Sequence, residues 1–273
     1  MPPACDQPQR PAPPADRATL LRLMDLNMWE MCREMTRYTR GGELIETPEL
    51  TLTASPFGAP FNNLALVRAP IDAGALIQAL QDFYVRRGRA FAIMTRKHAD
   101  TALEDALGER GFTVLVSEPG MALLADPGTR GEPPGLDVRP AVTDAGRRDF
   151  LHVSAEAYAT YEQPRPYTEA AFDALESVCS PQIQGFVGYV DGRPVAAAAL
   201  YLTHGVAGIG WVGTVPEERG RAYGEAVTWA AVREGFRRGA AFANLQASPM
   251  GRAVYERMGF VTVTKYRLLV GNP

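Results

Sequence analysis

The most informative part of the chain reads Trp211-Val-Gly-Thr-Val-Pro-Glu-Glu-Arg-Gly-Arg-Ala-Tyr-Gly224. An apolar, strand-like run stops at Pro216, and a basic loop that contains glycine leads directly into a segment with helical spacing. Glycine lets the backbone turn sharply, so that several amide N–H groups can point at one ligand. The helix N-terminus adds about half a positive charge, and Arg219 and Arg221 add whole charges. This order of elements predicts a site for an anion such as a phosphate group.

Other phosphate-binding motifs do not fit this loop. It lacks the Gly-Lys-Ser or Gly-Lys-Thr of a nucleotide P-loop, and Gly220-x-x-x-Gly224 is not the Gly-x-Gly-x-x-Gly of a dinucleotide fold. The whole chain is not basic either, since 28 Lys and Arg against 31 Asp and Glu give a net charge of −3. The overall charge therefore gives no support for nucleic-acid binding, and the anion site has to be local.

Composition bounds the class of protein. The three cysteines and three histidines are scattered, which indicates neither a disulfide framework nor a zinc site, so we expect no metal. Residues 1–17 are rich in proline and are expected to form a disordered tail. No apolar run approaches the roughly 20 residues that span a bilayer, so we expect a cytoplasmic protein without a membrane role.

The length of 273 residues and the apolar content of 46% are sufficient for two domains. A segment dense in glycine and proline at residues 127–134 is the expected linker. It separates a first domain at residues 18–126 from a second domain at residues 135–273. Asp191-Gly192 and His204-Gly205 are expected to be the turns between three consecutive antiparallel strands of the second domain.

Hydrophobic periodicity and turn residues predict a mixed α/β structure in both halves. The expected helices cover residues 18–38, 71–87, 100–110, 144–160, 168–178, 225–238 and 249–258. The expected strands cover residues 50–55, 61–67, 90–94, 183–190, 193–203, 206–215, 241–247 and 261–270. Residues 112–124 are expected to form two strands that are broken near Pro119-Gly120.

The two halves share residues as well as the order of elements. Arg86-Arg-Gly-Arg-Ala-Phe-Ala92 matches Arg237-Arg-Gly-Ala-Ala-Phe-Ala243, and Gly111-Phe112 matches Gly259-Phe260. The matched pieces hold the same place in each half, which indicates an internal repeat.

The repeat shows where the halves differ. The interval from Pro70 to Gly88 is 18 residues, whereas the interval from Pro216 to Gly239 is 23 residues. The shortfall falls where the second half has its basic loop, and the first half has an acid and no arginine at that place. We therefore expect one ligand site per chain, in the second half.

The loop Arg219-Gly-Arg-Ala-Tyr-Gly224 resembles the Arg/Gln-x-x-Gly-x-Gly/Ala signature of the GCN5-related N-acetyltransferase (GNAT) family, which lies between a central strand and a helix. A second stretch resembles the strand, turn and Tyr-x-x-x-Gly-Phe helix end of the same family: Leu245-Gln-Ala-Ser-Pro-Met-Gly-Arg-Ala-Val-Tyr-Glu-Arg-Met-Gly-Phe260. The resemblance covers residues from about 183 to 270. It implies two tandem acyl-CoA N-acyltransferase-like domains of mixed α/β class, with a mostly antiparallel sheet and helices on both faces. The first would be a degenerate copy without the pyrophosphate loop.

The resemblance further implies acetyl-CoA as the co-substrate. Its pantetheine arm would pair with the strand residues Val212, Gly213, Thr214 and Val215. Its pyrophosphate would be held by the loop residues Arg219, Gly220, Arg221, Ala222, Tyr223 and Gly224. Ser248 stands where the family commonly has Asn, and Ala222 stands where it commonly has glycine. A methyl group at Ala222 introduces strain if that position needs a positive φ.

Tyr255 is the implied catalytic residue, because the family's tyrosine at this place donates a proton or a hydrogen bond to the departing thiolate. The acceptor amine attacks the thioester directly and must be neutral. For a lysine-like amine of pKa about 10.4, deprotonation at pH 7 costs about 4.6 kcal/mol. A base or a water chain is therefore expected, yet residues 206–215 contain no carboxylate. Residues that could serve, with none preferred, are Glu156, Tyr161, Glu162, Tyr201 and His204.

The expected function is transfer of an acetyl group from acetyl-CoA to an unidentified amine of a small molecule or a peptide. Two alternatives stay open: a protein that binds or senses acyl-CoA without catalysis, and an acyltransferase with another acyl donor. The first domain is expected to supply a wall of the site or to replace a dimer partner. The chain would then act as a monomeric pseudo-dimer or as a homodimer, with no nucleic-acid or membrane partner.

Overall fold

The computed structural model describes residues 11–125, 128 and 131–272. The tail expected over residues 1–17 lies largely outside these ranges, and so does part of the linker expected over residues 127–134. Within the described ranges, no helix is both long enough and apolar enough to cross a membrane.

The first half opens with a long helix whose N-terminus is capped by Asp16. The Asp16 side chain accepts a hydrogen bond of 2.8 Å from the Thr19 N–H. The elements of this half are α1 (Arg17–Tyr38), β1 (Glu43–Glu46), β2 (Leu50–Ala54), η1 (Pro60–Asn62), β3 (Leu64–Val67), α2 (Ala73–Phe83), η2 (Val85–Arg87), β4 (Ala92–Arg96), α3 (Thr101–Gly108) and β5 (Thr113–Leu123).

The second half begins with an additional strand, β6, and then repeats the order of a helical region, three strands, a helix, a strand, a helix and a last strand. Its elements are β6 (Leu136–Pro140), α4 (Asp144–Tyr158), η3 (Ala159–Tyr161), α5 (Arg165–Ala171), η4 (Leu175–Ser177), β7 (Ile183–Val190), β8 (Arg193–Thr203), β9 (Val206–Thr214), η5 (Pro216–Glu218), α6 (Tyr223–Arg237), β10 (Phe242–Gln246), α7 (Arg252–Arg257) and β11 (Val261–Val270). The expected antiparallel run β7–β8–β9 is present. Its turns place Asp191, Gly192, His204 and Gly205 at positive φ.

The described strands form one sheet of 11 strands in the order β1-β2-β3-β4-β11-β5-β10-β9-β8-β7-β6. Among its neighbouring pairs, only β3–β4 and β9–β10 are parallel. The mixed α/β class with a mostly antiparallel sheet is therefore confirmed.

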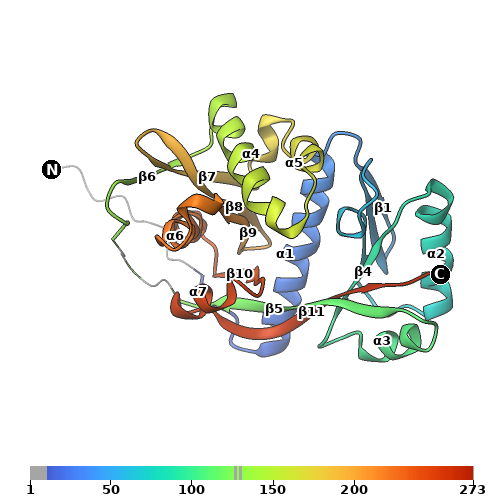
Figure 1. The fold of residues 1–273 in the computed structure, drawn as a ribbon. Helices are drawn as coiled ribbons and strands as arrows, with labels where there is room; N and C mark the ends of the chain where they lie inside the picture. The colour runs from blue at the N-terminus through green and yellow to red at the C-terminus, as the bar shows by residue number, and fades with distance from the viewer. Residues whose placement is uncertain (1–10, 126–127, 129–130, 273) are drawn as a thin grey trace.

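The last strands of the two halves are exchanged. β11 lies between β4 and β5 of the first half, and β5 pairs on its other side with β10 of the second half. β5 and β11 run side by side and antiparallel from the region of α7 to that of α2 and α3, and so connect the two halves (Figure 1). The expected domains at residues 18–126 and 135–273 thus follow the chain, but each half contributes one strand to the other half's part of the sheet.

Helices cover both faces of the sheet, and β9 shows which helix lies on which face. A Cβ atom on Gly208 would meet Asn27 of α1, and one on Gly213 would meet Ala157 of α4. The neighbouring Ala207 instead contacts Gly235 of α6. Successive strand residues point to opposite faces, and one extra residue in β9 between Gly210 and Gly213 shifts this alternation, so that Gly213 shares the face of Gly208. α1 and α4 therefore lie on one face and α6 lies on the other.

Two expected elements were wrong. Residues 113–123 form one strand, not two, because β10 and β11 supply backbone partners on both sides of Pro119. The Pro119 carbonyl accepts a hydrogen bond from the Ala247 N–H (3.0 Å). The helix expected over residues 168–178 is replaced by α5 and η4. α5 ends before Phe172, whose carbonyl accepts a hydrogen bond from Arg147 (2.6 Å).

The sequence did not predict two short strands, β1 and β6. They are the two edge strands of the sheet, and most of their residues are exposed or half-buried. A strand with little burial has no strong alternation of apolar and polar residues, so periodicity gives no signal there.

Gly208→Ala should destabilise the protein, because α1 packs directly on this glycine. An added Cβ would lie 2.1 Å from the Asn27 Oδ1 atom. The Asn27 amide meanwhile donates to the Tyr201 carbonyl (3.0 Å) and to Thr203 Oγ1 (2.8 Å), so it cannot move freely. We expect the free energy of unfolding to fall by about 1–3 kcal/mol in urea titrations.

The matched control is Gly108→Ala at the exposed end of α3, where an added Cβ meets nothing within 4 Å. This variant should be neutral or slightly stabilised. Equal stability of the Gly208 variant and the wild type would contradict the close packing of α1 on β9.

Candidate active site

The sheet opens between β9 and β10. These parallel strands pair only through Val206–Gly208 and Phe242–Asn244. Further along, β9 carries a bulge: Ala199 lies opposite Gly210 and Ala197 lies opposite Gly213, so Trp211 and Val212 share one partner. Trp211 has a φ of +52°. The bulge bends β9 locally at the point where its pairing with β10 has ended.

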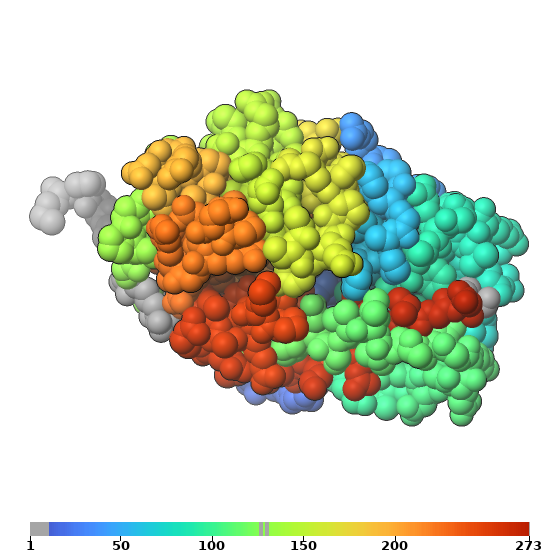
Figure 2. Space-filling model, in the orientation of Figure 1, coloured from blue at the N-terminus to red at the C-terminus, as the bar shows by residue number. Residues whose placement is uncertain are grey.

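A cavity of about 370 Å³ lies beside this opening. In Figure 2, α6, the end of α4 and α7 meet on one hollowed face of the molecule. The wall of the cavity comes from β9, the loop before α6, the first turn of α6, the end of α4 with η3, and the segment around α7. The lining residues are Ala157, Tyr158, Tyr161, Val212, Gly213, Thr214, Glu218, Arg219, Gly220, Ala222, Tyr223, Gly224, Glu225, Ser248, Met250, Gly251, Val254, Tyr255 and Arg257.

Most residues that the sequence assigned to cofactor binding lie around this cavity, together with Tyr255. Those that line it are Val212, Gly213, Thr214, Arg219, Gly220, Ala222, Tyr223, Gly224 and Ser248. Two lie outside that lining. Val215 belongs to the apolar core of the second half, and Arg221 forms an ion pair with Glu218 (3.0 Å).

The loop before α6 reaches the helix through left-handed backbone at Gly220 (φ +80°) and Ala222 (φ +60°). Ala222 is the N-cap of α6 and offers no side-chain hydrogen bond to it. The N–H groups of the first turn, Tyr223 to Glu225, therefore have no acceptor within the helix. They lie at the cavity wall, where they can bind an anion.

The cations around the cavity have unequal roles. Arg219 donates to the carbonyls of Thr214 and Ala157 and to Thr160 Oγ1, each at 3.3 Å, so it ties the loop to the end of α4. Arg257 of α7 also lines the cavity and lies 3.9 Å from Glu225. Arg257 was missed by sequence reasoning, because only the packing of α7 beside α6 brings it to the site.

Tyr255 lies on the α7 side of the cavity and is 8% exposed. Burial raises its pKa well above the ordinary value, and the charges of Tyr161 and Glu118 raise it further. A Cβ atom on Gly251 would lie 2.8 Å from the Tyr255 ring, so this glycine allows the tyrosine to pack closely. A tyrosine with a raised pKa keeps its proton at neutral pH, as a hydrogen-bond donor must.

Ser248 links the two sides of the cavity. Its Oγ accepts hydrogen bonds from the Tyr161 hydroxyl (3.2 Å) and from the Gly251 N–H (3.2 Å). It thereby fixes the turn that precedes α7.

Of the five residues considered as a base, only Tyr161 lines the cavity. Glu156 forms an ion pair with Arg165. Glu162 is exposed, and His204 lies in the exposed turn at the other end of β9. Tyr201 is 1% exposed, and burial raises its pKa, so it keeps its proton at neutral pH and cannot accept one from an amine.

The first half has a corresponding opening between β3 and β4, which is filled. These strands also pair in parallel through only three residues each. The buried Arg96 guanidinium donates to the Arg68 carbonyl (3.2 Å) and forms ion pairs with Asp100 (2.8 Å) and Asp25 (3.3 Å).

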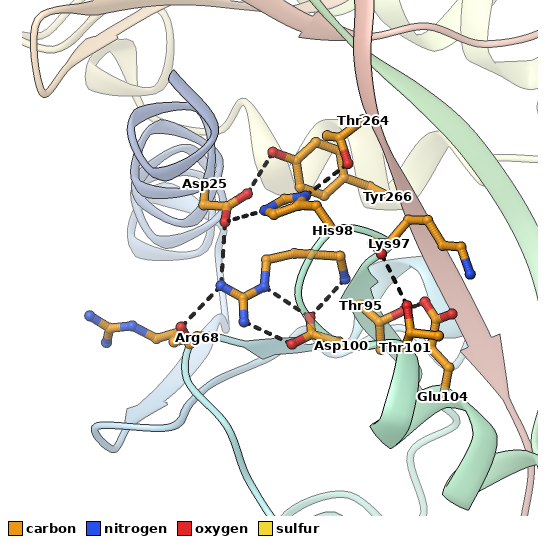
Figure 3. Close-up of polar contacts among 11 residues, drawn as sticks. Asp25, Arg68, Thr95, Lys97, His98, Asp100, Thr101, Glu104, Thr264 and Tyr266 are labelled. Atoms are coloured by element: carbon orange, nitrogen blue, oxygen red, sulfur yellow. Dashed lines mark hydrogen bonds and ion pairs between the residues drawn. The ribbon is translucent and has the colours of Figure 1, made fainter. Parts of the chain in front are cut away.

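Asp25 of α1 then connects this opening to β11. It accepts a hydrogen bond from the Tyr266 hydroxyl (2.8 Å), and His98 lies between Asp25 (3.1 Å) and Thr264 (2.8 Å). Figure 3 shows these side chains facing one another around Asp25. The first half thus uses its opening for a closed polar network, and among the described residues no group of His, Cys, Asp and Glu is suited to hold a metal ion.

Comparisons with known proteins concern the family of the second half and the fold of the whole chain. Residues 148–260 match the sequence model of the acetyltransferase (GNAT) family. No curated protein is significantly similar to the chain in sequence. A GCN5-related N-acetyltransferase from Kribbella flavida superposes with a TM-score of 0.69 at 20% identity, over 92% of this chain and 96% of that one.

Other solved structures share the whole architecture. A tandem GNAT protein from the clavulanic acid biosynthesis pathway has a TM-score of 0.62 at 16% identity, over 97% of this chain and 98% of that one. A GCN5-related N-acetyltransferase from Sphaerobacter thermophilus has a TM-score of 0.62 at 16% identity, over 95% and 93%. At these identities the likeness concerns the fold, which in the first of these proteins is also a tandem arrangement.

Ala222→Gly should stabilise the protein. An alanine in left-handed backbone is strained by about 1–2 kcal/mol, and glycine removes this strain. Glycine also makes the unfolded chain more flexible, which lowers the stability of the folded protein by about 0.4–1 kcal/mol. We expect a gain in the free energy of unfolding of up to about 1.5 kcal/mol in urea titrations. The same substitution at the exposed Ala253 inside α7 should instead cost about 1 kcal/mol. Equal losses at both positions would contradict the strained conformation of Ala222.

Proposed function

We propose that this chain, whose residues 148–260 form a domain of the acetyltransferase (GNAT) family, transfers an acetyl group from acetyl-CoA to a primary amine by direct attack. The observation that carries the proposal is the single cavity wall that joins the bulged end of β9, the loop before α6 and Tyr255. This wall combines anion-binding N–H groups with a protonated donor. The coenzyme would supply an acetyl group activated as a thioester.

The residues present fit the coenzyme. The free N–H groups of Tyr223 to Glu225 and the loop at Gly220 suit a pyrophosphate. Arg221 and Arg257 would add positive charge at its rim, while Arg219 would act mainly by holding the loop against α4. The bulged segment from Val212 to Thr214 would offer backbone groups to the pantetheine arm and the thioester carbonyl.

Tyr255 would donate to the departing thiolate. Its raised pKa makes complete transfer of the proton to a thiolate of pKa about 8.5 unfavourable. Its main contribution would then be a hydrogen bond that strengthens as charge develops on sulfur.

The acceptor would be an amine of a small molecule or a peptide, and the protein would act in the cytoplasm. The continuous sheet and the contact between the end of α1 and α5 support a monomeric pseudo-dimer, in which the first half would take the place of a partner subunit.

The decisive experiment measures release of free thiol from acetyl-CoA by the wild-type protein. The acceptors are lysine, a lysine-containing peptide, spermidine and phenethylamine, each against a reaction without amine. Amine-dependent thiol release is expected. Binding of acetyl-CoA without thiol release for any amine would favour the sensing alternative, and release from another acyl-CoA in preference would favour a different donor.

The variant Arg219→Glu with Arg221→Glu should bind acetyl-CoA about 10-fold to 100-fold more weakly by calorimetry, because it removes the charge of Arg221 and the bonds by which Arg219 holds the loop. Hydrogen bonds of charged groups contribute about 1.5–3 kcal/mol. The control is Arg86→Glu with Arg87→Glu in the first half, which changes the net charge equally. Equal affinities of the two double variants would remove the loop from the coenzyme site.

Tyr255→Phe should lower kcat about 100-fold and leave the KM for acetyl-CoA nearly unchanged, because the lost hydrogen bond acts on the transition state. Tyr189→Phe on β7 is the control. An unchanged kcat in the Tyr255 variant would exclude this residue from the mechanism.

A further inference from the structure

The proposed reaction needs a group that accepts a proton from the acceptor amine, and β9 contains no carboxylate. We propose that Glu118 of β5, a residue of the first half, is the catalytic base of the site in the second half. This inference rests on the proposed function, and it identifies a catalytic residue that the chain contributes across the repeat boundary.

The strand exchange brings Glu118 to the end of β10. The neighbouring Pro119 accepts a hydrogen bond from the N–H of Ala247, which directly precedes the cavity residue Ser248. On its other side Glu118 lies opposite Tyr266 of β11. Glu118 is not one of the lining residues themselves, but it lies next to them, beside the end of β10 and close to Ser248.

Glu118 also lies on the face of the sheet that α1 and α4 cover. Ala122, four residues along the same strand, packs with Leu20 and Met24 of α1. Residues separated by an even number of positions share a face, and the pairing of β5 with β10 and β11 continues without an extra residue in β5 from Glu118 to Ala122. Tyr158, which lines the cavity, stands at the end of α4 on this same face.

The electrostatics connect Glu118 to both sides of the cavity. Burial raises the pKa of Tyr158 and of Tyr255, and in each case the negative charge of Glu118 raises the pKa further. The carboxylate thus lies within electrostatic range of one cavity residue from α4 and one from α7. Burial raises the pKa of Glu118 itself, and among the described residues no cation pairs with it. A carboxylate of this kind is a stronger base than an exposed one.

The proton balance of the step is simple. The acceptor ammonium gives one proton to the Glu118 carboxylate and becomes a neutral amine. Its nitrogen forms the C–N bond and the C–S bond breaks, while Tyr255 donates a hydrogen bond to the departing thiolate. The nitrogen sheds its second proton to solvent, and the thiolate takes up one proton from solvent. The Glu118 carboxylic acid then releases its proton to solvent.

The first half, whose opening is filled, can be compared with the second at the same position of the repeat. Gly120 of β5 lies opposite Gln246, the last residue of β10, and Tyr266 of β11 lies opposite Arg96, the last residue of the equivalent strand β4. Two positions before these equivalent residues stand Glu118 on β5 and Thr264 on β11. The half whose opening is filled therefore carries a neutral threonine, bonded to His98, where the half with the cavity carries a carboxylate.

The test is Glu118→Gln, with kcat and kcat/KM measured from pH 5 to pH 10 with the best amine of the panel. Wild-type activity should fall as pH falls through the pKa of Glu118, because the protonated acid cannot accept a proton. In the variant, kcat at pH 7 should be at least about 100-fold lower. The deficit should shrink as pH rises and more amine is neutral, while the affinity for acetyl-CoA, measured by calorimetry, stays unchanged.

The groups that face Glu118 do not obscure this profile. Burial raises the pKa of Tyr158 on α4, Tyr255 on α7 and Tyr266 on β11. Asp25 and His98, beyond Tyr266, are present in both proteins. In the variant, activity should follow only the fraction of neutral amine, so an inflection that the wild type shows and the variant lacks belongs to Glu118.

Two further variants complete the test. Glu118→Asp should retain the inflection with an intermediate kcat, and Glu109→Gln at the exposed end of α3 should match the wild type. If Glu118→Gln keeps the wild-type kcat and pH profile, Glu118 is not the base and the proposed function is unaffected. If the wild type releases no thiol with any amine, the proposed function and this inference fall together.

Discussion

The backbone pairing of β5 with β11 is the constraint on which the rest of the structure depends. Each strand ends its own repeat, and each continues the sheet of the other repeat, since β5 pairs with β10 and β11 pairs with β4. The N–H and C=O groups along these strands therefore find their partners in the other half. Separate halves would expose unpaired strand edges and the apolar faces of these strands. The exchange also carries side chains of one half into the site of the other.

The two halves show how one framework can serve stability or chemistry. Both have a short parallel pair that opens on one side. In the first half the opening holds Arg96, and a buried guanidinium requires the partners that Asp25 and Asp100 supply. In the second half a cavity remains beside the small β9 residues Gly213 and Thr214. The filled network holds α1, β4 and β11 together, so the closed half supports the open one.

Backbone strain is concentrated beside the cavity. Trp211 and Ala222 have positive φ values that are uncommon for residues with a Cβ atom. The surroundings of Trp211 hold it in place, since its ring packs against Tyr158 and Phe172 at 4.8 Å between ring centres. Ala222 is held by the start of α6. Strained residues persist where packing over-determines them, and they cluster at functional sites.

Several features could be read from the chain itself because they are local. The helix from Arg17, the β7–β8–β9 hairpins and the strand Val261–Val270 follow periodicity and turn residues. The loop from Arg219 to Gly224 was identifiable for the same reason, and its absence from the first repeat indicated which half would hold the cavity.

Only the tertiary structure decided which strands are neighbours. Residues 113–123 looked like two strands because Pro119 interrupts a local pattern. In the structure they form one strand that pairs with β11 along one edge and with β10 along the other, both more than 100 positions away in the sequence. The position of Glu118 beside the end of β10 depends on the same long-range pairing. The place of Arg257 in the cavity wall and the filling of the first half's opening by Arg96 likewise depend on contacts between distant parts of the chain. The amino-acid sequence determined the elements and the anion loop, because backbone propensity, periodicity and turn chemistry act over a few residues. It left the composition of the site to the fold, because an alternating strand pattern specifies a buried face but not the strand that will lie beside it.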